Sequence, residues 1–126
     1  MACTEKNSLS GRWAIEMEGS NDTAFILPND TICSPELRFE YDTVYMDIKV
    51  DGKTVKSDFI GQYTTEENKL KIVNRRGEER LCVYRIVNDT MEVSYLTEPD
   101  KIIMRLHKIK EDWKISILFF YTPLNN

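Results

Sequence analysis

Apolar and polar residues alternate along most of this chain, which is the period of a half-buried β-strand. The first such run follows Gly11 and puts Trp13, Ile15 and Met17 on one face. Later runs of the same kind cover 37–41, 44–50, 55–65, 69–73, 81–87, 90–96, 101–109 and 113–121. No stretch shows the period of a helix longer than one or two turns. The pattern therefore predicts an all-β fold.

Short turn sequences separate these runs, and they predict how the strands are joined. Asp51 and Gly52 form the pair that most strongly favours a two-residue hairpin. Regular spacing of this kind favours an antiparallel meander, and closing such a sheet removes its exposed edges. We expect an up-and-down β-barrel of about eight strands. Gly11 would bend the chain over one end of it, Trp13 would close that end from inside, and Gly61 would mark a bulge or a sharp bend.

Residues 19–36 form a long polar passage rich in turn residues, which is uncommon inside a compact domain. An apolar segment at 24–27 lies within it. We expect this segment to be a short strand or a helical turn that plugs the barrel mouth. The alternative is a mobile lid over a cavity.

Size and charge limit what the chain can do. Its 126 residues suffice for one domain, which we place at 9–126 after a polar tether at 1–8. The net charge of -4 argues against nucleic acid as a partner, because no basic excess is present to displace counterions. No apolar run approaches the ~20 residues that a membrane-spanning helix needs. We expect a monomer.

The cysteines bear on where in the cell the protein is found. Cys3 follows Met1-Ala2 and precedes the polar tether, an order that resembles the lipid-bearing first cysteine of processed bacterial lipoproteins. This predicts export to the cell envelope, in the periplasm or on the outer-membrane surface, with a lipid on Cys3 as the only membrane contact. The alternative is an intracellular protein with an incidental cysteine. Cys33 and Cys82 then remain as a pair that could oxidise or stay free.

The sequence carries none of the common catalytic motifs. Gly-x-Ser-x-Gly, phosphate-binding loops and His-Glu-x-x-His are all missing from it. The single histidine, His107, falls on the outward face of its predicted strand, so we expect a surface or rim side chain. Three scattered cysteines and one histidine do not suit a zinc site. We therefore expect a non-enzyme with no catalytic residues, no metal and no cofactor.

Several short motifs, taken in order, resemble the lipocalin-like (calycin) families, in particular the short lipocalin-like lipoproteins of bacteria. These are Gly-Arg-Trp at 11–13, Gly-Gln-Tyr-Thr at 61–64, Asn-Lys-Leu-Lys-Ile at 68–72 and the hairpin sequence at 84–91. The resemblance covers roughly residues 9 to 109. It implies that Arg105 packs its guanidinium over the Trp13 indole, a cation–π contact.

The chain also departs from the lipocalin pattern. It has no clean counterpart of the Thr-Asp-Tyr motif, and 113–121 is patterned as a strand where larger members have a helix. META-type domains, small bacterial β-domains that also open with Leu-x-Gly-x-Trp, are the second choice. Residues 34–39 are similar to their second strand, but their Gly-Cys-Asn is missing here.

The lipocalin-like resemblance implies a binding module that holds a small apolar molecule inside the barrel. The expected lining residues share the inward faces of the strands: Phe39, Met46, Ile48, Tyr63, Tyr84, Met91, Val93 and Met104. The plain alternative for each of them is core packing. The rival function is a scaffold without a ligand, whose loops or outer face contact a protein or a glycan at the cell surface.

Overall fold

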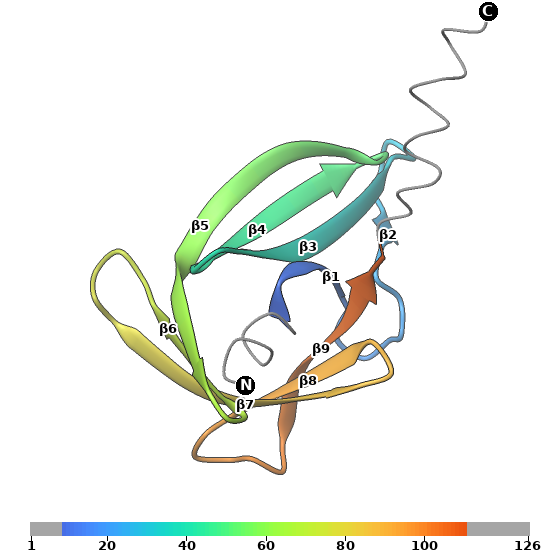
Figure 1. The fold of residues 1–126 in the computed structure, drawn as a ribbon. Coiled ribbons are helices and arrows are strands. Elements are labelled where there is room, and N and C mark those ends of the chain that lie inside the picture. Colours follow the sequence, from blue (N-terminus) through green and yellow to red (C-terminus); the bar gives the residue numbers. More distant parts are fainter. Residues whose placement is uncertain (1–8, 111–126) are drawn as a thin grey trace, which may run out of the picture.

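The computed structural model describes residues 9–110, and every secondary-structure element in them is a strand (Figure 1). The strands are β1 (Gly11–Ile15), β2 (Phe25–Ile26), β3 (Ile32–Glu40), β4 (Thr43–Val50), β5 (Lys53–Glu66), β6 (Lys69–Val73), β7 (Glu79–Val87), β8 (Thr90–Tyr95) and β9 (Ile102–Ile109). The predicted all-β fold is confirmed. The tether 1–8 with Cys3, and the strand predicted at 113–121, lie outside the described residues.

The strands form one antiparallel sheet that closes on itself. Their order is β1-β9-β8-β7-β6-β5-β4-β3-β2, and β1 also pairs with β3. Every strand except β2 therefore belongs to a closed, barrel-like ring, which we call the barrel (Figure 1). Because consecutive strands run in opposite directions, the connections alternate between two ends. The closed end carries the turns at 41–42, 67–68 and 88–89, and the open end carries those at 16–24, 51–52, 74–78 and 96–101.

Trp13 fills the closed end of the barrel, as the sequence predicts. Its side chain is 1% exposed, and Nε1 donates a hydrogen bond to the carbonyl oxygen of Leu9 at 2.9 Å. Gly11 has φ +117°, where other residues are strained. A Cβ at Gly11 would also lie 2.7 Å from Lys108 Nζ. The backbone angle favours glycine at this position, whereas the Lys108 side chain could move aside for a Cβ.

The cation over the indole is Lys108, and the expectation for Arg105 is wrong. Lys108 pairs with Trp13 in the strand register, and its Nζ lies 4.8 Å from the ring centroid. Arg105 has the opposite parity on β9 and so lies on the outer wall. There its guanidinium contacts Glu92 at 3.1 Å and Glu16 at 3.3 Å. The strand alternation decides which cation can reach the inside.

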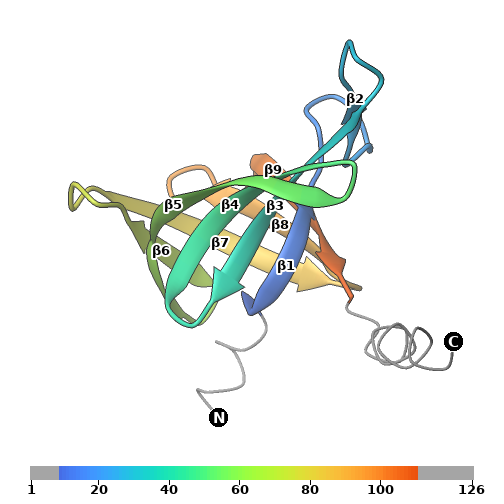
Figure 2. The ribbon, with the colours of Figure 1, turned by 90° about the horizontal axis from the view of Figure 1, so that it is seen from above.

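The segment 24–27 contains a short strand, β2, as predicted, but it belongs to an arm and does not plug the barrel mouth, so the predicted plug is wrong. β2 pairs with the first residues of β3, and Figure 2 shows this arm projecting away from the ring. Phe25 is 43% exposed and Ile26 is 73% exposed. β3 starts earlier than predicted and runs through Pro35. Proline fits there because β2 pairing ends at Cys33 and β1 pairing begins at Glu36, which leaves Pro35 unpaired on that side.

β5 bends sharply at Gly61, as predicted. Val44 pairs with Gly61 and Tyr45 pairs with Phe59, so Ile60 is the extra residue of a bulge. β6 pairs only with the stretch of β5 from Gln62 to Glu66. The first part of β5 therefore has β4 on one side and no strand on the other.

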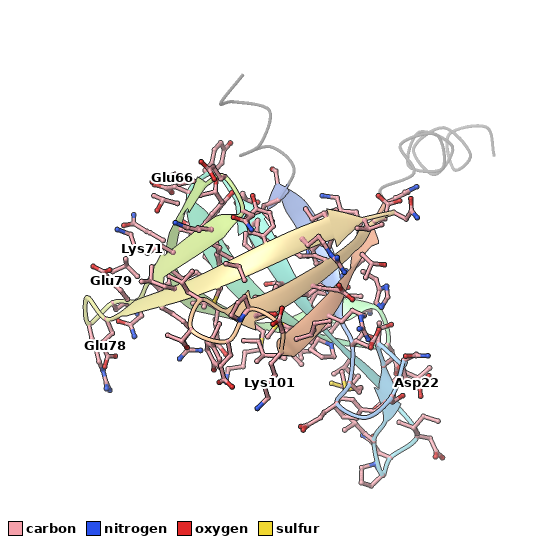
Figure 3. All side chains as sticks on the ribbon, turned by 90° about the horizontal axis from the view of Figure 1, so that it is seen from below. Asp22, Glu66, Lys71, Glu78, Glu79 and Lys101 are labelled. Atoms are coloured by element: carbon pink, nitrogen blue, oxygen red, sulfur yellow. The ribbon has the colours of Figure 1, made fainter. Side chains whose placement is uncertain are left out.

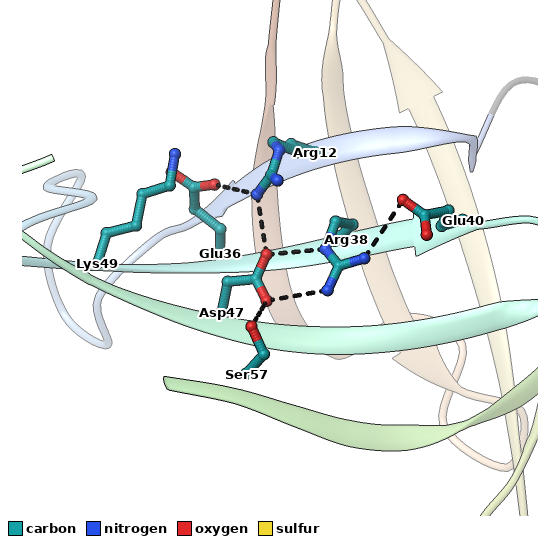
Figure 4. Close-up of polar contacts among 7 residues, drawn as sticks. All are labelled: Arg12, Glu36, Arg38, Glu40, Asp47, Lys49 and Ser57. Atoms are coloured by element: carbon teal, nitrogen blue, oxygen red, sulfur yellow. Dashed lines mark hydrogen bonds and ion pairs between the residues drawn. The ribbon is translucent and has the colours of Figure 1, made fainter. Parts of the chain in front are cut away.

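A buried carboxylate ties four strands together on the outer wall (Figure 4). Asp47 on β4 is 1% exposed. It accepts hydrogen bonds from Arg12 of β1 at 2.8 Å, Arg38 of β3 at 2.9 Å and Ser57 of β5 at 2.7 Å. These bonds cross the seam between β1 and β3 where the ring closes.

Cys33 on β3 and Cys82 on β7 are both free and buried. Their register partners differ completely, since Cys33 pairs with Phe25 and Val50, whereas Cys82 pairs with Leu70 and Tyr95. Of the two alternatives that the sequence left open, the structure has the unpaired thiols.

Candidate functional site

The candidate site is a cavity of about 560 Å³ inside the barrel, toward the open end. Its apolar lining comes from the inner faces of seven of the ring strands: Leu37, Phe39, Val44, Met46, Ile60, Leu70, Ile72, Cys82, Met91, Val93, Ile103, Met104 and Leu106. Its polar lining is confined to the β6–β7 connection and the start of β7: Asn74, Glu78, Glu79 and Arg80. The cavity is therefore apolar within and polar at one rim.

Strand alternation explains why the wall of this cavity is apolar. Leu70 pairs with Cys82, and Met91 pairs with both Ile86 and Leu106, so inward residues of neighbouring strands stand side by side. Met91 and Leu106 have no exposed surface at all. Apolar walls around a space of this size cannot hold ordered water well, because water needs polar partners.

The structure brings together part of the predicted lining. Phe39, Met46, Met91, Val93 and Met104 contribute to the cavity wall. Ile48, Tyr63 and Tyr84 lie outside the lining. Contact of any of these side chains with a ligand remains a prediction.

The two tyrosines pack as core on the closed-end side of the cavity. Tyr63 meets Phe39 edge-on, with ring centroids 5.1 Å apart, and Tyr84 donates its hydroxyl to the carbonyl oxygen of Glu67 at 3.3 Å. Burial raises the pKa of the Tyr63 hydroxyl, and the nearby Asp42 and Tyr84 raise it further. Tyr63 therefore stays neutral, and its role here is to fill space.

The polar rim was not predicted from the sequence. The turn at 74–78 has no periodicity, and its geometry depends on one side chain. Asn74 Oδ1 accepts hydrogen bonds from the backbone N–H of Arg76 and Glu78, at 2.9 and 3.0 Å, while Asn74 Nδ2 donates to Glu78 Oε1 at 2.8 Å. Asparagine at the head of a turn is a recognisable signal for such a loop, but not for a cavity rim.

One contact spans the space between this turn and the unpaired part of β5. The guanidinium of Arg75 lies over the Phe59 ring, 4.9 Å from its centroid. Figure 3 shows Glu78 and Glu79 together at the same protruding turn. The contact joins the β6–β7 turn to β5 where the two strands are not paired, and neither side chain belongs to the cavity lining.

His107 lies on the outer wall, as predicted. Its Nε2 is 2.6 Å from Glu16 Oε2, and Arg105 contacts the other oxygen of that carboxylate. The hydrogen bond with His107 is the main cause of a lowered pKa at Glu16; burial opposes it and Arg105 adds to it. The Glu16–His107 pair connects β9 to the residue that directly follows β1.

The described part of the chain, residues 9–110, offers neither a metal site nor a membrane-spanning helix. No group of three or more His, Cys, Asp or Glu side chains there could hold a metal ion. Nor does any helix between residues 9 and 110 have the length and hydropathy that crossing a membrane requires.

Comparison with known proteins gave no match: no family model, no curated protein and no solved structure is significantly similar to this chain.

Proposed function

We propose that this protein is a non-enzymatic binding module of lipocalin-like type that holds a small apolar molecule in the barrel. The observation that carries the proposal is the cavity of about 560 Å³ with its apolar wall. Ligand pockets in proteins have volumes of roughly 300–1,000 Å³ and are mostly apolar with a few polar groups. The cavity fits this description in size and in lining.

The expected affinity is modest. Burying about 400 Å² of apolar ligand surface is worth roughly 10 kcal/mol. Lost translational and rotational freedom offsets part of any such gain. We therefore expect dissociation constants on the order of 1–100 μM for simple apolar probes.

A fluorescence titration with the neutral apolar dye N-phenyl-1-naphthylamine tests the proposal. The wild-type protein should bind the dye saturably. Met46→Trp replaces a flexible side chain of the cavity wall with a bulky indole. The indole occupies space that the dye needs, so binding should weaken at least about tenfold. Val87→Trp is the matched control, because Val87 is half-exposed on the outer wall and outside the cavity lining.

The result must be read beside the stability of each variant. Urea denaturation should show that Met46→Trp and Val87→Trp are both folded under the titration conditions. Absence of saturable dye binding by the folded wild-type protein would refute a ligand-binding barrel, as would equal binding by the two variants.

We further propose that the module is an exported bacterial lipoprotein anchored through Cys3. The support is the order of residues around Cys3 in the sequence, since Cys3 lies outside the described structure. Labelled palmitate should be incorporated into the protein in its native host and should not be incorporated after Cys3→Ser. Equal labelling of both proteins, or none in either, would refute the anchor and leave the cavity proposal untouched.

A second candidate function is a ligandless scaffold that contacts a protein or a glycan at the cell surface. It is favoured by the apolar side chains that the β2–β3 arm exposes, Phe25, Ile26 and Ile32. Apolar side chains gathered on a projecting element are typical of contact surfaces. A folded protein that binds no apolar probe would support this second function over the first.

A further inference from the structure

The first part of β5 presents a free sheet edge. β4 pairs with β5 from Lys53 onward, whereas β6 pairs with it only from Gln62 onward. Among residues 9–110, no strand therefore lies on the other side of 53–60 (Figure 1). Such an edge carries a row of unpaired backbone N–H and C=O groups, which can serve as a template for another strand. The free edge of β2 is only two residues long.

The side chains along this edge are exposed and carry charges of both signs. Residues 53–58 are all exposed. Val55 is 62% exposed, and the side chains of Lys56 and Asp58 are 66% and 50% exposed. Lysine on a sheet edge commonly prevents pairing with another chain. Here the lysine lies two residues from an aspartate, so an antiparallel copy of the same segment can bring the opposite charge to it.

One antiparallel register makes the segment complementary to itself. With a two-fold axis at Ser57, Lys56 of each copy stands opposite Asp58 of the other, and Val55 stands opposite Phe59. Opposite charges and apolar–aromatic pairs are favourable cross-strand neighbours. An axis at Lys56 or at Asp58 puts like charges opposite each other, and an axis between two of these residues puts both charges opposite uncharged side chains. The order of charges therefore favours the register about Ser57.

The edge strand is held in place from the side of the barrel wall. The Ser57 hydroxyl donates a hydrogen bond to Asp47 at 2.7 Å. The Phe59 ring packs edge-on against Tyr45, with centroids 6.3 Å apart, and carries the Arg75 guanidinium over its face. A segment that is already ordered loses less conformational freedom when a partner pairs with it.

We propose that two copies of this chain form a symmetric dimer by pairing the free edges of β5 about Ser57. Two-fold dimers, in which both copies use the same patch, are the commonest assemblies of identical chains. The dimer departs from the monomer expected from the sequence, because a free edge arises only when the sheet is folded. It is independent of the proposed binding function. One strand from each copy makes a small interface, so we expect a dissociation constant on the order of 10–100 μM.

Sedimentation equilibrium of the 126-residue chain under reducing conditions tests the proposal. Wild type should change from monomer to dimer as its concentration rises from about 1 to about 500 μM, since self-association follows mass action. Reducing conditions exclude dimers that are joined through oxidised cysteines.

Charge exchange tests the register. Lys56→Asp and Asp58→Lys each place like charges opposite one another at two positions of the dimer, so each should weaken self-association at least about tenfold. An equal mixture of the two variants should form a heterodimer about as tightly as wild type, because every charge then meets its opposite across the axis. The double variant Lys56→Asp/Asp58→Lys should also dimerise like wild type for the same reason.

Lys110→Asp is the matched control. It makes the same change of net charge as Lys56→Asp and also removes the lysine of an exposed ion pair, here with Asp89 at 2.9 Å, but it lies outside β5. Its dissociation constant should stay within about twofold of wild type.

Wild-type protein that stays monomeric over the whole concentration range would overturn the proposal. Single variants that dimerise like wild type would overturn it too, as would a mixture of the two that does not associate. None of these results bears on dye binding, which is a property of each copy. Urea midpoints of the variants near that of wild type, measured at about 1 μM where the monomer prevails, establish that each variant is folded.

Discussion

At the scale of single residues, Asp47 shows how a charge is accommodated in the wall of the barrel. Burial acts to raise its pKa, but the hydrogen bonds from Arg38 and Ser57 and the charge of Arg38 outweigh burial, and the pKa is lowered. The carboxylate is therefore ionised at neutral pH and holds four strands through its partners. A buried carboxylate of this kind is costly to disrupt, because its cationic partners lose their counter-charge.

We expect Asp47→Asn to destabilise the protein by about 2 kcal/mol. The amide keeps the shape of the side chain but loses the charge that Arg12 and Arg38 share. Urea denaturation monitored by circular dichroism measures the change. Asp58→Asn is the matched control, since Asp58 is exposed on β5 and its one ion pair within residues 9–110 is with Lys56, at 3.6 Å. It should cost less than about 0.5 kcal/mol, and an equal loss in both variants would contradict this account of Asp47.

The same residues predict how stability depends on pH. The pKa values of Asp47 and Glu16 are lower in the folded protein than usual. A lowered folded pKa contributes stability above the unfolded pKa that is lost as pH falls through the folded one. The free energy of unfolding should thus fall below about pH 4. In Glu16→Gln this fall should be shallower than in wild type, and an unchanged acid slope would show that the Glu16 contacts do not contribute.

At Arg105, the alternation of apolar and polar residues and the resemblance to lipocalin-like proteins lead to different predictions. The alternation along 101–109 puts Met104 and Leu106 inside and Arg105 outside, and the structure has this arrangement. The resemblance instead put Arg105 over Trp13, a place that Lys108 takes. A cation–π contact depends on which strand position faces the ring, so the local alternation was the better guide.

At the scale of elements, β5 carries the main departure from a regular sheet. Gly61 allows the strand to turn from β4 to β6, and a Cβ there would lie 2.5 Å from Val73 O and 2.8 Å from Ile72 Cγ2. Real Cβ atoms do not approach a backbone oxygen so closely, so the two strands would have to separate. Ile60, the extra residue of the bulge, and Ile72 are both part of the cavity lining, so the bend adjoins the cavity.

We predict that Gly61→Ala destabilises the protein by about 2 kcal/mol or more, because the clash is with backbone that cannot move aside. Gly77→Asn is the control: Gly77 has φ +80° and open space around it, and asparagine tolerates that backbone conformation. It should change the urea midpoint little. If Gly61→Ala were as harmless as Gly77→Asn, the close approach of β5 and β6 would be wrong.

Turn chemistry was predictable from the sequence where it involves special backbone angles. Asp51 and Gly52 have φ +51° and +82°, as a two-residue hairpin turn requires. The alternating pattern did not predict the start of β3, because Ser34 and Pro35 are typical of loops; only the resemblance of residues 34–39 to a META-type strand pointed to it. A proline fits in β3 because neither β1 nor β2 pairs with Pro35 on the side facing away from β4. This gap in the pairing depends on how the whole sheet is assembled.

At the scale of the whole molecule, the alternating pattern predicts a closed sheet but not whether its interior is full. Each inward face is apolar, and the ring follows from pairing β1 with β3. The cavity volume depends on how facing side chains meet across the barrel. Trp13 and Tyr63 fill the closed end, whereas Met46, Met91 and Met104 leave space toward the open end. Nothing in the one-dimensional pattern distinguishes these two sets.

The measurement that tests the central claim most directly is the methyl spectrum of the methionines. Met46, Met91 and Met104 line the cavity, whereas Met17 lies outside its lining. In protein labelled with ¹³C at the methionine methyl groups, added 1-decanol should shift the signals of Met46, Met91 and Met104 saturably and leave Met17 unchanged. Unmoved signals from all three lining methionines, or a shift confined to Met17, would contradict a ligand cavity inside the barrel.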